Sequence, residues 1–300
     1  MSKSPTKSEY IVLQSNHTPA VDIAGTAVAE AIHKAHPEKR LIVTTNFPEI
    51  WLHNPNVWRV YKLGQTPYFF EDFVEGRDTQ IFIHSPLKSS DFINGTDHLI
   101  KVWCDMCAVP YNGEKPALYF TQRESEVAMR MTQSDRPLFF IQPYEMHGAV
   151  SQTGWSWPKD LPTDIAAKIV NKMVVAGYQP VLIKNQNQPA IAGAGILQMS
   201  LRLALAALQY SSKRLFVDSF MQVAAAALDK PSVVTWLSTH PQKTGYDMHT
   251  NIMARIDTDL KNILDQYHPF FDIDNKMINS RVDTSRAYDV DAIVKVLLQS

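Results

Sequence analysis

Cysteine, excess charge and long apolar runs are all scarce in this 300-residue sequence. Two cysteines cannot form a disulfide framework, and they indicate a reducing compartment. The 29 Lys and Arg residues balance 30 Asp and Glu residues, so no global field attracts nucleic acid or an anionic membrane. No apolar run approaches the ~18 residues that span a bilayer, and residues 1–10 lack the apolar stretch of a secretory signal. We therefore expect a cytoplasmic protein without a transmembrane segment, and composition gives no reason to expect nucleic acid as a partner.

Apolar residues make up 45% of the chain, which is enough for one large domain or two medium ones. Hydrophobic periodicity alternates between strand-like and helix-like segments along most of the sequence. The predicted strands cover residues 10–13, 40–45, 58–63, 80–84, 138–142, 180–183, 214–217 and 232–236, and the predicted helices cover residues 22–35, 96–108, 124–131, 163–176, 199–209, 221–228 and 290–298.

A polar break at residues 134–137 separates two such series, which predicts two α/β domains with parallel sheets. Doubly wound domains bind ligands at the carboxyl ends of their strands. We therefore expect two Rossmann-like, doubly wound domains that face a central ligand cleft.

The segment 214–246 carries the strongest indication of chemistry. A buried strand runs into Asp218 and Ser219, which are placed to cap an alanine-rich helix. The free backbone amides and the positive dipole end of such a helix suit a diphosphate. The alternative is an ordinary capped helix, which any α/β protein contains.

This segment resembles the signature region of glycosyltransferase family 9, the lipopolysaccharide heptosyltransferase family. That family has a strand ending in Asp-Ser-Gly, a His, an Ala-rich helix, a Lys-Pro, and a Thr-x-Pro…Thr-Gly-Pro loop. The counterparts in this sequence are Asp218-Ser219, Ala224–Ala227, Lys230-Pro231, Val233-Val234, Thr239-His240-Pro241 and Thr244-Gly245. The first half also matches, with Asp22 before a helix that ends at His36-Pro37, and with Asn54-Pro55-Asn56-Val57 downstream.

The resemblance implies a GT-B fold and an inverting, metal-independent transfer of a sugar from a nucleotide-diphosphate donor to a glycan or other hydroxyl acceptor, with no cofactor. It implies an acceptor-side domain at residues 1–134, a nucleotide-sugar domain at 135–286, and a final helix at 287–300 that packs back on the first domain. It makes Asp22 the catalytic base, although a helix cap explains Asp22 equally well. The expected donor-binding residues are Asp218, Ser219, Gln222, Thr239, Thr244, Gly245, Lys184, Gln142 and Tyr144.

Several positions depart from the family pattern. Phe220 replaces the Gly after Asp-Ser, Gln222 stands where a His is usual, and Trp155 stands where a phosphate-binding Lys is found. Val21 replaces the Gly before Asp22, and Lys184 and Lys243 are candidates for the missing positive charge. These departures keep two alternatives open, a catalytically inactive relative that binds a nucleotide or glycan, and a sugar-nucleotide epimerase on the same fold.

Two other motifs favour structural interpretations. Three Asp-x-Asp pairs, at 257/259, 272/274 and 289/291, suggest a divalent metal, but helix capping explains those that precede helical runs. Cys104 and Cys107 have the spacing of a redox centre, yet they fall on the apolar face of a predicted helix. We expect them to be packing residues.

Overall fold

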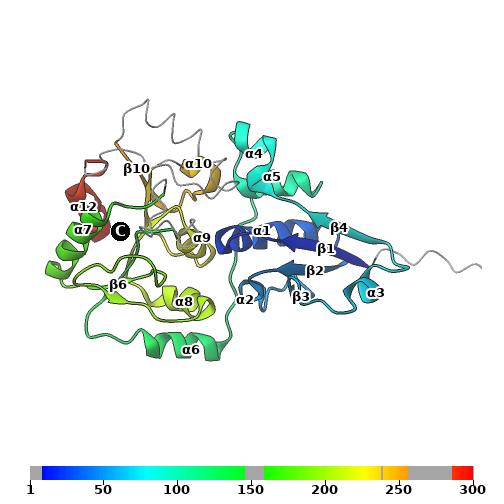
Figure 1. Cartoon of the computed structure of the whole chain (residues 1–300), viewed down its shortest axis with the longest axis horizontal. Helices are drawn as coiled ribbons and strands as arrows, with labels where there is room; N and C mark the ends of the chain where they lie inside the picture. The colour runs from blue at the N-terminus through cyan, green and yellow to red at the C-terminus, as the bar shows by residue number, and fades with distance from the viewer. Residues whose placement is uncertain (1–8, 146–158, 238, 256–285, 300) are drawn as a thin grey trace, which may run out of the picture. The chain divides into compact units, whose positions relative to one another are not determined.

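A computed structural model describes residues 9–145, 159–237, 239–255 and 286–299 (Figure 1). The chain divides into two compact units, Met1–Thr121 and Gln122–Ser300, and each has its own parallel sheet. The predicted class, α/β with parallel sheets, is therefore confirmed. Within the described ranges, no helix combines the length and apolarity needed to cross a membrane.

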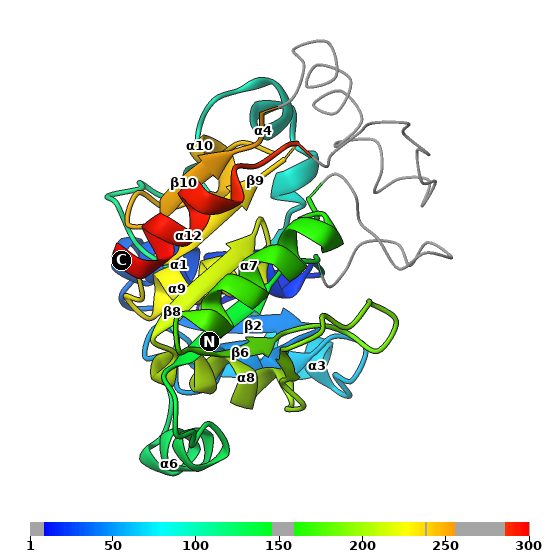
Figure 2. The same ribbon diagram turned by 90° about the vertical axis from the view of Figure 1, so that its left-hand side faces the viewer.

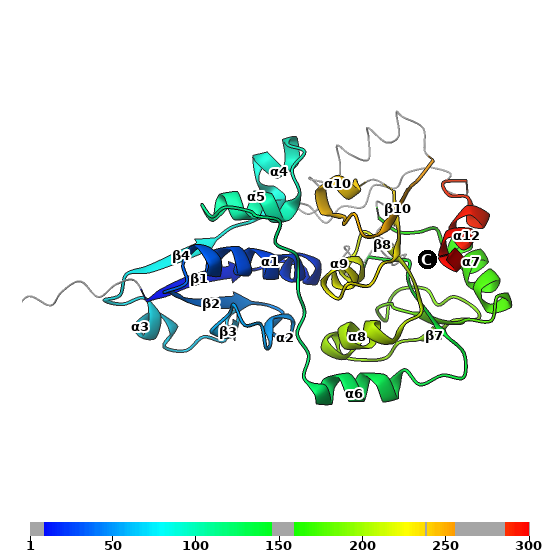
Figure 3. The same ribbon diagram turned by 180° about the vertical axis from the view of Figure 1, so that it is seen from behind.

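The first unit contains a four-stranded parallel sheet in the order β3-β2-β1-β4 (Figure 3). Its order places a topological switch point between β1 and β4, because the chain winds outward from β1 in both directions. The strands are β1 (Tyr10–Ser15), β2 (Arg40–Thr45), β3 (Arg59–Lys62) and β4 (Thr79–Ile83), and the helices are α1 (Pro19–Ala35), α2 (Pro48–Trp51), α3 (Phe69–Phe73), η1 (Pro86–Lys88), α4 (Ser90–Asn94) and α5 (Leu99–Met106).

Helix α1 begins at Pro19, three residues before the predicted start at Asp22. Thr18 is the N-cap residue, and the Asp22 amide donates to the Thr18 carbonyl at 3.1 Å. A proline suits the first helical position because its missing N–H has no intrahelical partner there. Asp22 is therefore inside the first turn, and its side chain is not the cap of α1.

The second unit contains a six-stranded parallel sheet in the order β10-β9-β8-β5-β6-β7 (Figure 2). Counted within the unit, this is the Rossmann order, and its switch point lies between β5 and β8. The strands are β5 (Leu138–Gln142), β6 (Gln179–Leu182), β7 (Gly195–Ile196), β8 (Lys213–Val217), β9 (Val233–Trp236) and β10 (Thr250–Met253), and the helices are α6 (Gln122–Met131), α7 (Thr163–Val175), α8 (Leu201–Ala207), η2 (Leu208–Tyr210), α9 (Phe220–Ala227), α10 (Pro241–Thr244) and α12 (Val290–Gln299).

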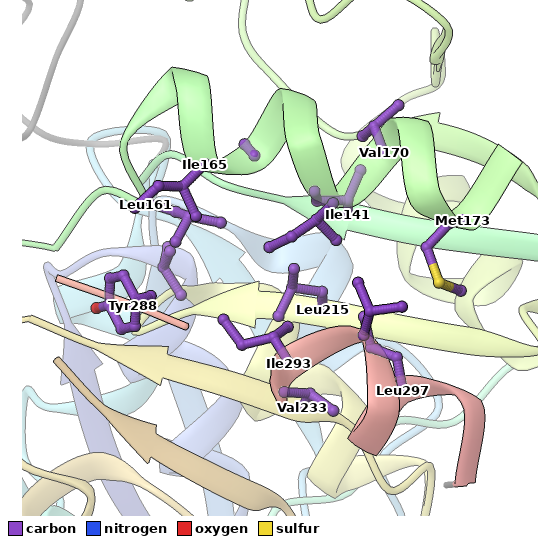
Figure 4. Close-up of a cluster of buried hydrophobic side chains, with 14 of the residues drawn as sticks. Ile141, Leu161, Ile165, Val170, Met173, Leu215, Val233, Tyr288, Ile293 and Leu297 are labelled. Carbon is purple, nitrogen blue, oxygen red and sulfur yellow. The ribbon is translucent and has the colours of Figure 1, made fainter. Parts of the chain in front are cut away.

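The final helix, α12, belongs to the core of the second unit. Its buried residues Ile293 and Leu297 face Leu215 of β8 and Val233 of β9 (Figure 4). Helix α7 packs beside it, and Lys172 of α7 forms an ion pair with Asp291 at 2.8 Å. We expected residues 287–300 to pack back on the first domain. The structure corrects this expectation, because the apolar face of α12 is buried in the core of the second unit.

The boundary between the units also lies earlier than the expected position after residue 134. Helix α6 packs against α8, and the guanidinium of Arg202 donates to both Glu124 carboxylate oxygens, at 2.8 and 3.1 Å. The Tyr210 hydroxyl adds a hydrogen bond to the Ser125 carbonyl at 2.9 Å. These contacts place α6 in the second unit.

Candidate functional site

The carboxyl edge of the second sheet carries a cluster of buried polar side chains. Gln142 ends β5 and Ser219 follows β8, so the two residues lie on either side of the switch point. The Ser219 hydroxyl donates to the Gln142 side-chain oxygen at 2.6 Å. Two of the predicted donor-binding residues are thus brought together at the position where α/β sheets bind ligands.

Helix α9 starts at this position with its first turn uncapped by a side chain. Ser219 is the N-cap residue, but its hydroxyl is engaged with Gln142 and makes no capping hydrogen bond. The backbone amides of the first turn therefore keep their donor capacity, and the helix dipole gives this end a partial positive charge. Phe220, which stands in place of the family's Gly, occupies the first helical position and is buried.

Asp218 is held from two directions. The Thr244 hydroxyl donates to one carboxylate oxygen at 3.3 Å, and the Lys159 ammonium lies 3.2 Å from the other. The Lys159 side chain is 20% exposed and that of Asp218 is 8% exposed, so solvent screens this ion pair only partly. Lys159 was not among the lysines expected from the sequence. Its position directly after Trp157-Pro158, in the segment that resembles the family's phosphate-binding region, was the available signal.

Gln222 joins the cluster from the first turns of α9. Its side-chain amide donates to the Thr244 carbonyl at 2.9 Å, and the His249 Nε2 donates to the Gln222 carbonyl at 2.9 Å. Because a carbonyl only accepts, Nε2 of His249 carries a hydrogen. Burial lowers the pKa of His249, which keeps the ring neutral and leaves a lone pair on Nδ1.

Four buried polar atoms of this edge have neither a hydrogen bond nor an ion pair within the described part of the chain. They are Gln142 Nε2, Gln222 Oε1, Thr239 Oγ1 and His249 Nδ1. Buried polar groups are nearly always paired with protein, ordered water or a ligand. These atoms include both hydrogen-bond donors and hydrogen-bond acceptors, so this edge is suited to bind a polar ligand.

The other expected donor-binding residues lie apart from these contacts. Tyr144 is fully buried, and its hydroxyl lies 3.1 Å from the Thr163 hydroxyl, so it packs inside the unit. The Lys184 ammonium donates to the Asn185 carbonyl at 2.6 Å. Gly245 is the C-cap residue directly after α10, where an added Cβ would lie 2.7 Å from the Pro241 carbonyl oxygen, so the turn requires glycine. Trp155 lies outside the described residues.

In the first unit, Asp22 is completely enclosed. Its carboxylate accepts hydrogen bonds from the hydroxyls of Ser15 and Thr45 and from the Trp51 indole at 3.2 Å. Ser15 and Thr45 end the neighbouring strands β1 and β2, and Trp51 ends α2. Asp22 therefore ties together the carboxyl ends of two strands and two helices.

Burial raises the pKa of Asp22 to about 6, although the three hydrogen bonds oppose this shift. A carboxylate with this pKa has the basicity expected of a general base. However, Asp22 has an exposed fraction of 0%, so no acceptor hydroxyl reaches it in this structure. Its predicted role as catalytic base stays a prediction.

The structure also locates the alternative motifs. Among the described residues, no group of three or more His, Cys, Asp or Glu side chains is arranged to hold a metal ion. Asp289 caps α12 by accepting from the Ala292 amide at 3.0 Å, as its sequence position indicates, and the pairs 257/259 and 272/274 lie outside the described residues. Cys104 and Cys107 are buried free thiols whose pKa burial raises to about 12, which confirms packing over redox chemistry.

Compared with known proteins by sequence, the chain matches no protein-family model and no curated protein. Solved structures do match. A family 9 glycosyl transferase from Veillonella parvula superposes with a TM-score of 0.66 at 12% identity, covering 99% of this chain and 100% of the other. The ADP-heptose lipopolysaccharide heptosyltransferase II of E. coli gives 0.63 at 14% identity, covering 97% and 99%.

A third match is the iron-containing dodecameric heptosyltransferase TibC from enterotoxigenic E. coli, in complex with ADP-D-β-D-heptose. It gives a TM-score of 0.65 at 14% identity, covering 99% of this chain and 76% of TibC. These matches extend over nearly the whole chain. The resemblance to glycosyltransferase family 9 is thus confirmed at the level of the fold, which is that of the family 9 heptosyltransferases.

Proposed function

We propose that this protein is a glycosyltransferase that moves a sugar from a nucleotide-diphosphate donor to a hydroxyl acceptor. The observation that carries the proposal is the polar cluster at the carboxyl edge of the second sheet. There the uncapped start of α9, the unpaired amide nitrogen of Gln142 and the Lys159–Asp218 pair lie at the switch point of a Rossmann sheet. Amide donors and a lysine are the groups that bind and stabilise a departing diphosphate.

The donor-binding role belongs to the second unit in this proposal. Asp218, Ser219, Gln142, Gln222 and Thr244 are linked there by hydrogen bonds. Thr239, Gly245, Lys184 and Tyr144 lie in the same unit, where we expect them to shape or support the site. ADP-heptose is the first donor to test, because the matched TibC structure contains ADP-D-β-D-heptose.

In this proposal the first unit provides the acceptor side. Transfer then proceeds with inversion in a single displacement. We propose that no metal takes part, since helix-start amides and Lys159 supply the positive potential that a metal would otherwise provide. With two cysteines and balanced charge, we expect the protein to act in the cytoplasm on a glycan or another hydroxyl-bearing acceptor.

A second candidate is a catalytically inactive relative that binds a nucleotide sugar. The observation that favours it is the enclosure of Asp22, the residue expected to deprotonate the acceptor. In that case the donor site of the second unit still binds its ligand, but no transfer follows.

Calorimetry against ADP-heptose and against other ADP-, UDP-, GDP- and CMP-linked sugars tests the proposal. We expect one nucleotide class to bind, equally well with and without EDTA, and Ser219→Ala to weaken binding. Binding that requires a divalent cation would overturn metal independence. Failure of every nucleotide sugar to bind would overturn the glycosyltransferase proposal, and binding without turnover on any acceptor would favour the inactive relative.

A further inference from the structure

Two histidines meet at the switch point of the first sheet. His17 lies just beyond the end of β1, and His84 lies just beyond the end of β4. The Nε2 of His17 donates to the backbone carbonyl of His84 at 2.9 Å. This hydrogen bond spans the two strands between which a doubly wound sheet binds its ligand, so His17 is at the place expected for a substrate contact.

The partner of His17 fixes which ring nitrogen carries the hydrogen. A carbonyl oxygen only accepts, so Nε2 holds the hydrogen and the neutral ring keeps its lone pair on Nδ1. Nδ1 has no hydrogen-bond partner within the described residues. The Trp103 ring meets the imidazole edge-on, with centroids 5.8 Å apart and an interplanar angle of 89°, which fixes the plane of the ring.

The surroundings of His17 keep the ring neutral. Burial lowers its pKa most, the Lys88 charge lowers it further, and the hydrogen bond to the His84 carbonyl opposes both effects. The other titratable groups nearby are the His84 imidazole, whose pKa burial also lowers, and the Cys107 thiol 3.7 Å from His84 Nδ1, whose pKa is raised. Neither neighbour carries charge at neutral pH. The hydrogen bond to the His84 carbonyl favours an imidazolium, but burial outweighs it and the pKa stays lowered.

His17 and Asp22 differ in their exposure to solvent, and so in whether a substrate can reach them. His17 is partly exposed, whereas Asp22 is fully buried and accepts three hydrogen bonds. Next to His17, the exposed side chains of Asn16 and Asn46 are joined by a 2.8 Å hydrogen bond across the ends of β1 and β2. This edge offers polar groups to an acceptor hydroxyl beside an available lone pair.

We propose that His17, rather than Asp22, is the general base of the transfer, an inference that rests on the proposed function. The acceptor oxygen forms a bond to the anomeric carbon of the donor while the bond from that carbon to the diphosphate oxygen breaks. The electron pair of the broken bond leaves with the diphosphate, and the acceptor's proton passes to His17 Nδ1. The resulting imidazolium returns its proton to solvent after the product leaves. Asp22 is then a positioning residue that fixes the strand ends around this edge.

The tautomer is tested directly by NMR on the full-length protein with ¹⁵N-labelled histidine. The His17 signals are assigned by their loss in His17→Gln. We expect a neutral ring at pH 7 with the hydrogen on Nε2, and a pKa below the ordinary value of a histidine. A hydrogen on Nδ1, or an imidazolium at pH 7, would overturn the proposal without bearing on whether the protein is a glycosyltransferase.

The catalytic role is tested with ADP-heptose, using water as the acceptor and measuring release of ADP. General bases contribute roughly 10²- to 10⁴-fold, so His17→Gln should lose activity to that extent with an unchanged donor dissociation constant. His33→Gln, a partly exposed histidine near the other end of α1, is the matched control and should keep the wild-type rate. Added imidazole should restore part of the activity of His17→Ala, which a merely structural role would not permit.

The pH profile separates the two candidate bases. The wild-type rate should fall on acidification as Nδ1 takes up a proton, and this fall should be absent in His17→Gln but present in Asp22→Asn. If His17→Gln keeps the wild-type rate while the donor is turned over, His17 is not the base and the proposed function stands. If the donor binds without turnover, the protein is an inactive relative and the base assignment is overturned. If no nucleotide sugar binds, the proposed function itself fails.

Discussion

Asp22 contributes to folding through the four segments that it joins. Its carboxylate accepts from Ser15 of β1, Thr45 of β2 and Trp51 of α2, and its own backbone lies in α1. The buried carboxylate thus provides a hydrogen-bond acceptor for two hydroxyls and one indole N–H that would otherwise be unpaired. Replacing it leaves donors unpaired in the core, which costs about 1–3 kcal/mol for each unsatisfied group.

The raised pKa of Asp22 predicts how stability depends on pH. The folded pKa of about 6 exceeds the ordinary value of 3.8, so between these values the folded state binds more protons than the unfolded state. Asp22 therefore favours folding most when it is protonated, and its contribution falls by ~2 kcal/mol as pH rises from 4 to 7. Urea unfolding of wild type and Asp22→Asn at pH 4.5 and 7 measures this. The wild type should gain stability relative to the variant on acidification, and a gain in the opposite direction would contradict the assignment.

Lys159 is expected to supply the main side-chain charge for the donor diphosphate. It is held beside the start of α9 by Asp218, whereas the Lys184 ammonium is bound to the carbonyl of its neighbour. A charge-assisted hydrogen bond contributes about 1.5–3 kcal/mol, so Lys159→Gln should weaken ADP-heptose binding roughly 10- to 100-fold.

Lys168→Gln is the control for that measurement, because Lys168 forms an exposed pair with Asp164 on α7. Lys184→Gln should have a smaller effect than Lys159→Gln. The double variant Lys159→Gln/Asp218→Asn removes the buried unpaired carboxylate and separates lost binding from lost stability. Equal donor affinity in Lys159→Gln and Lys168→Gln by calorimetry would exclude the role of Lys159.

Residue roles were harder to predict than residue positions. Asp218, Ser219, Gln222 and Thr244 are predictable because they follow strands or lie in the same signature segment. The structure links Asp218 and Gln222 through Thr244, and it links Ser219 to Gln142. Lys159 is not predictable in this way, since it lies in the loop before α7 and is identified only by its contact with Asp218. Asp22 is predicted as a cap or a base, because the sequence does not show that side chains from two strands and a helix enclose it.

At the scale of elements, α1 depends on a close approach to two tryptophans. An added Cβ at Gly25 would lie 2.8 Å from a ring carbon of Trp103 and 3.1 Å from one of Trp51. Both indoles are buried, so neither ring has room to move away. Glycine is thus required by packing in the middle of a helix that otherwise favours alanine.

Gly25→Ala therefore tests packing against helix propensity. Alanine gains up to ~1 kcal/mol in a helix, but overpacking a tight core costs about 1–3 kcal/mol, so we expect net destabilisation. Urea unfolding measures the change. In a Trp103→Leu background the cost of Gly25→Ala should be much smaller, because the smaller side chain leaves space. An equal cost in both backgrounds would show that the Trp103 contact is not the cause.

The buried elements were predictable and the peripheral ones were not. Strands β1, β2, β5, β8 and β9 each contain a run of buried apolar residues, and the sequence predicts each strand within a few residues. Strand β7 has two residues, both exposed, and β10 is an edge strand, so neither has a hydrophobic pattern to detect. The short helices α2 and α10 each begin at a proline and have only four residues, so they are equally hard to identify from the sequence. The boundary between the two units lies before α6 and not after residue 134 for a related reason. The packing of α6 on α8 depends on the contact of Glu124 with Arg202, which is distant in the sequence.

At the scale of the whole molecule, the chain has two parallel sheets, each with its own switch point, and the proposed reaction assigns a different role to each. In the second unit, the edge between β5 and β8 carries amides, hydroxyls and Lys159. In the first unit, the edge between β1 and β4 carries His17 and His84. The groups of the second unit suit an anionic donor, and the histidines of the first unit suit proton transfer from an acceptor. Both roles depend on a few local groups, so the balanced overall charge of the chain gives no indication of either site.

This division predicts where donor binding alters hydrogen exchange. At 100 times its dissociation constant, a ligand stabilises the unit that binds it by ~2.7 kcal/mol, which slows exchange by global opening up to about 100-fold. With ADP-heptose, we expect protection in peptides covering Asp218–Gln222 and Thr239–Gly245, and in the core strands β5 and β8. Peptides from β1 and β2 should exchange as before, because in the proposed reaction only the second unit holds the donor. Stronger protection in the first unit than in the second would show that the first unit binds the donor. That result would contradict the proposed roles of the two units.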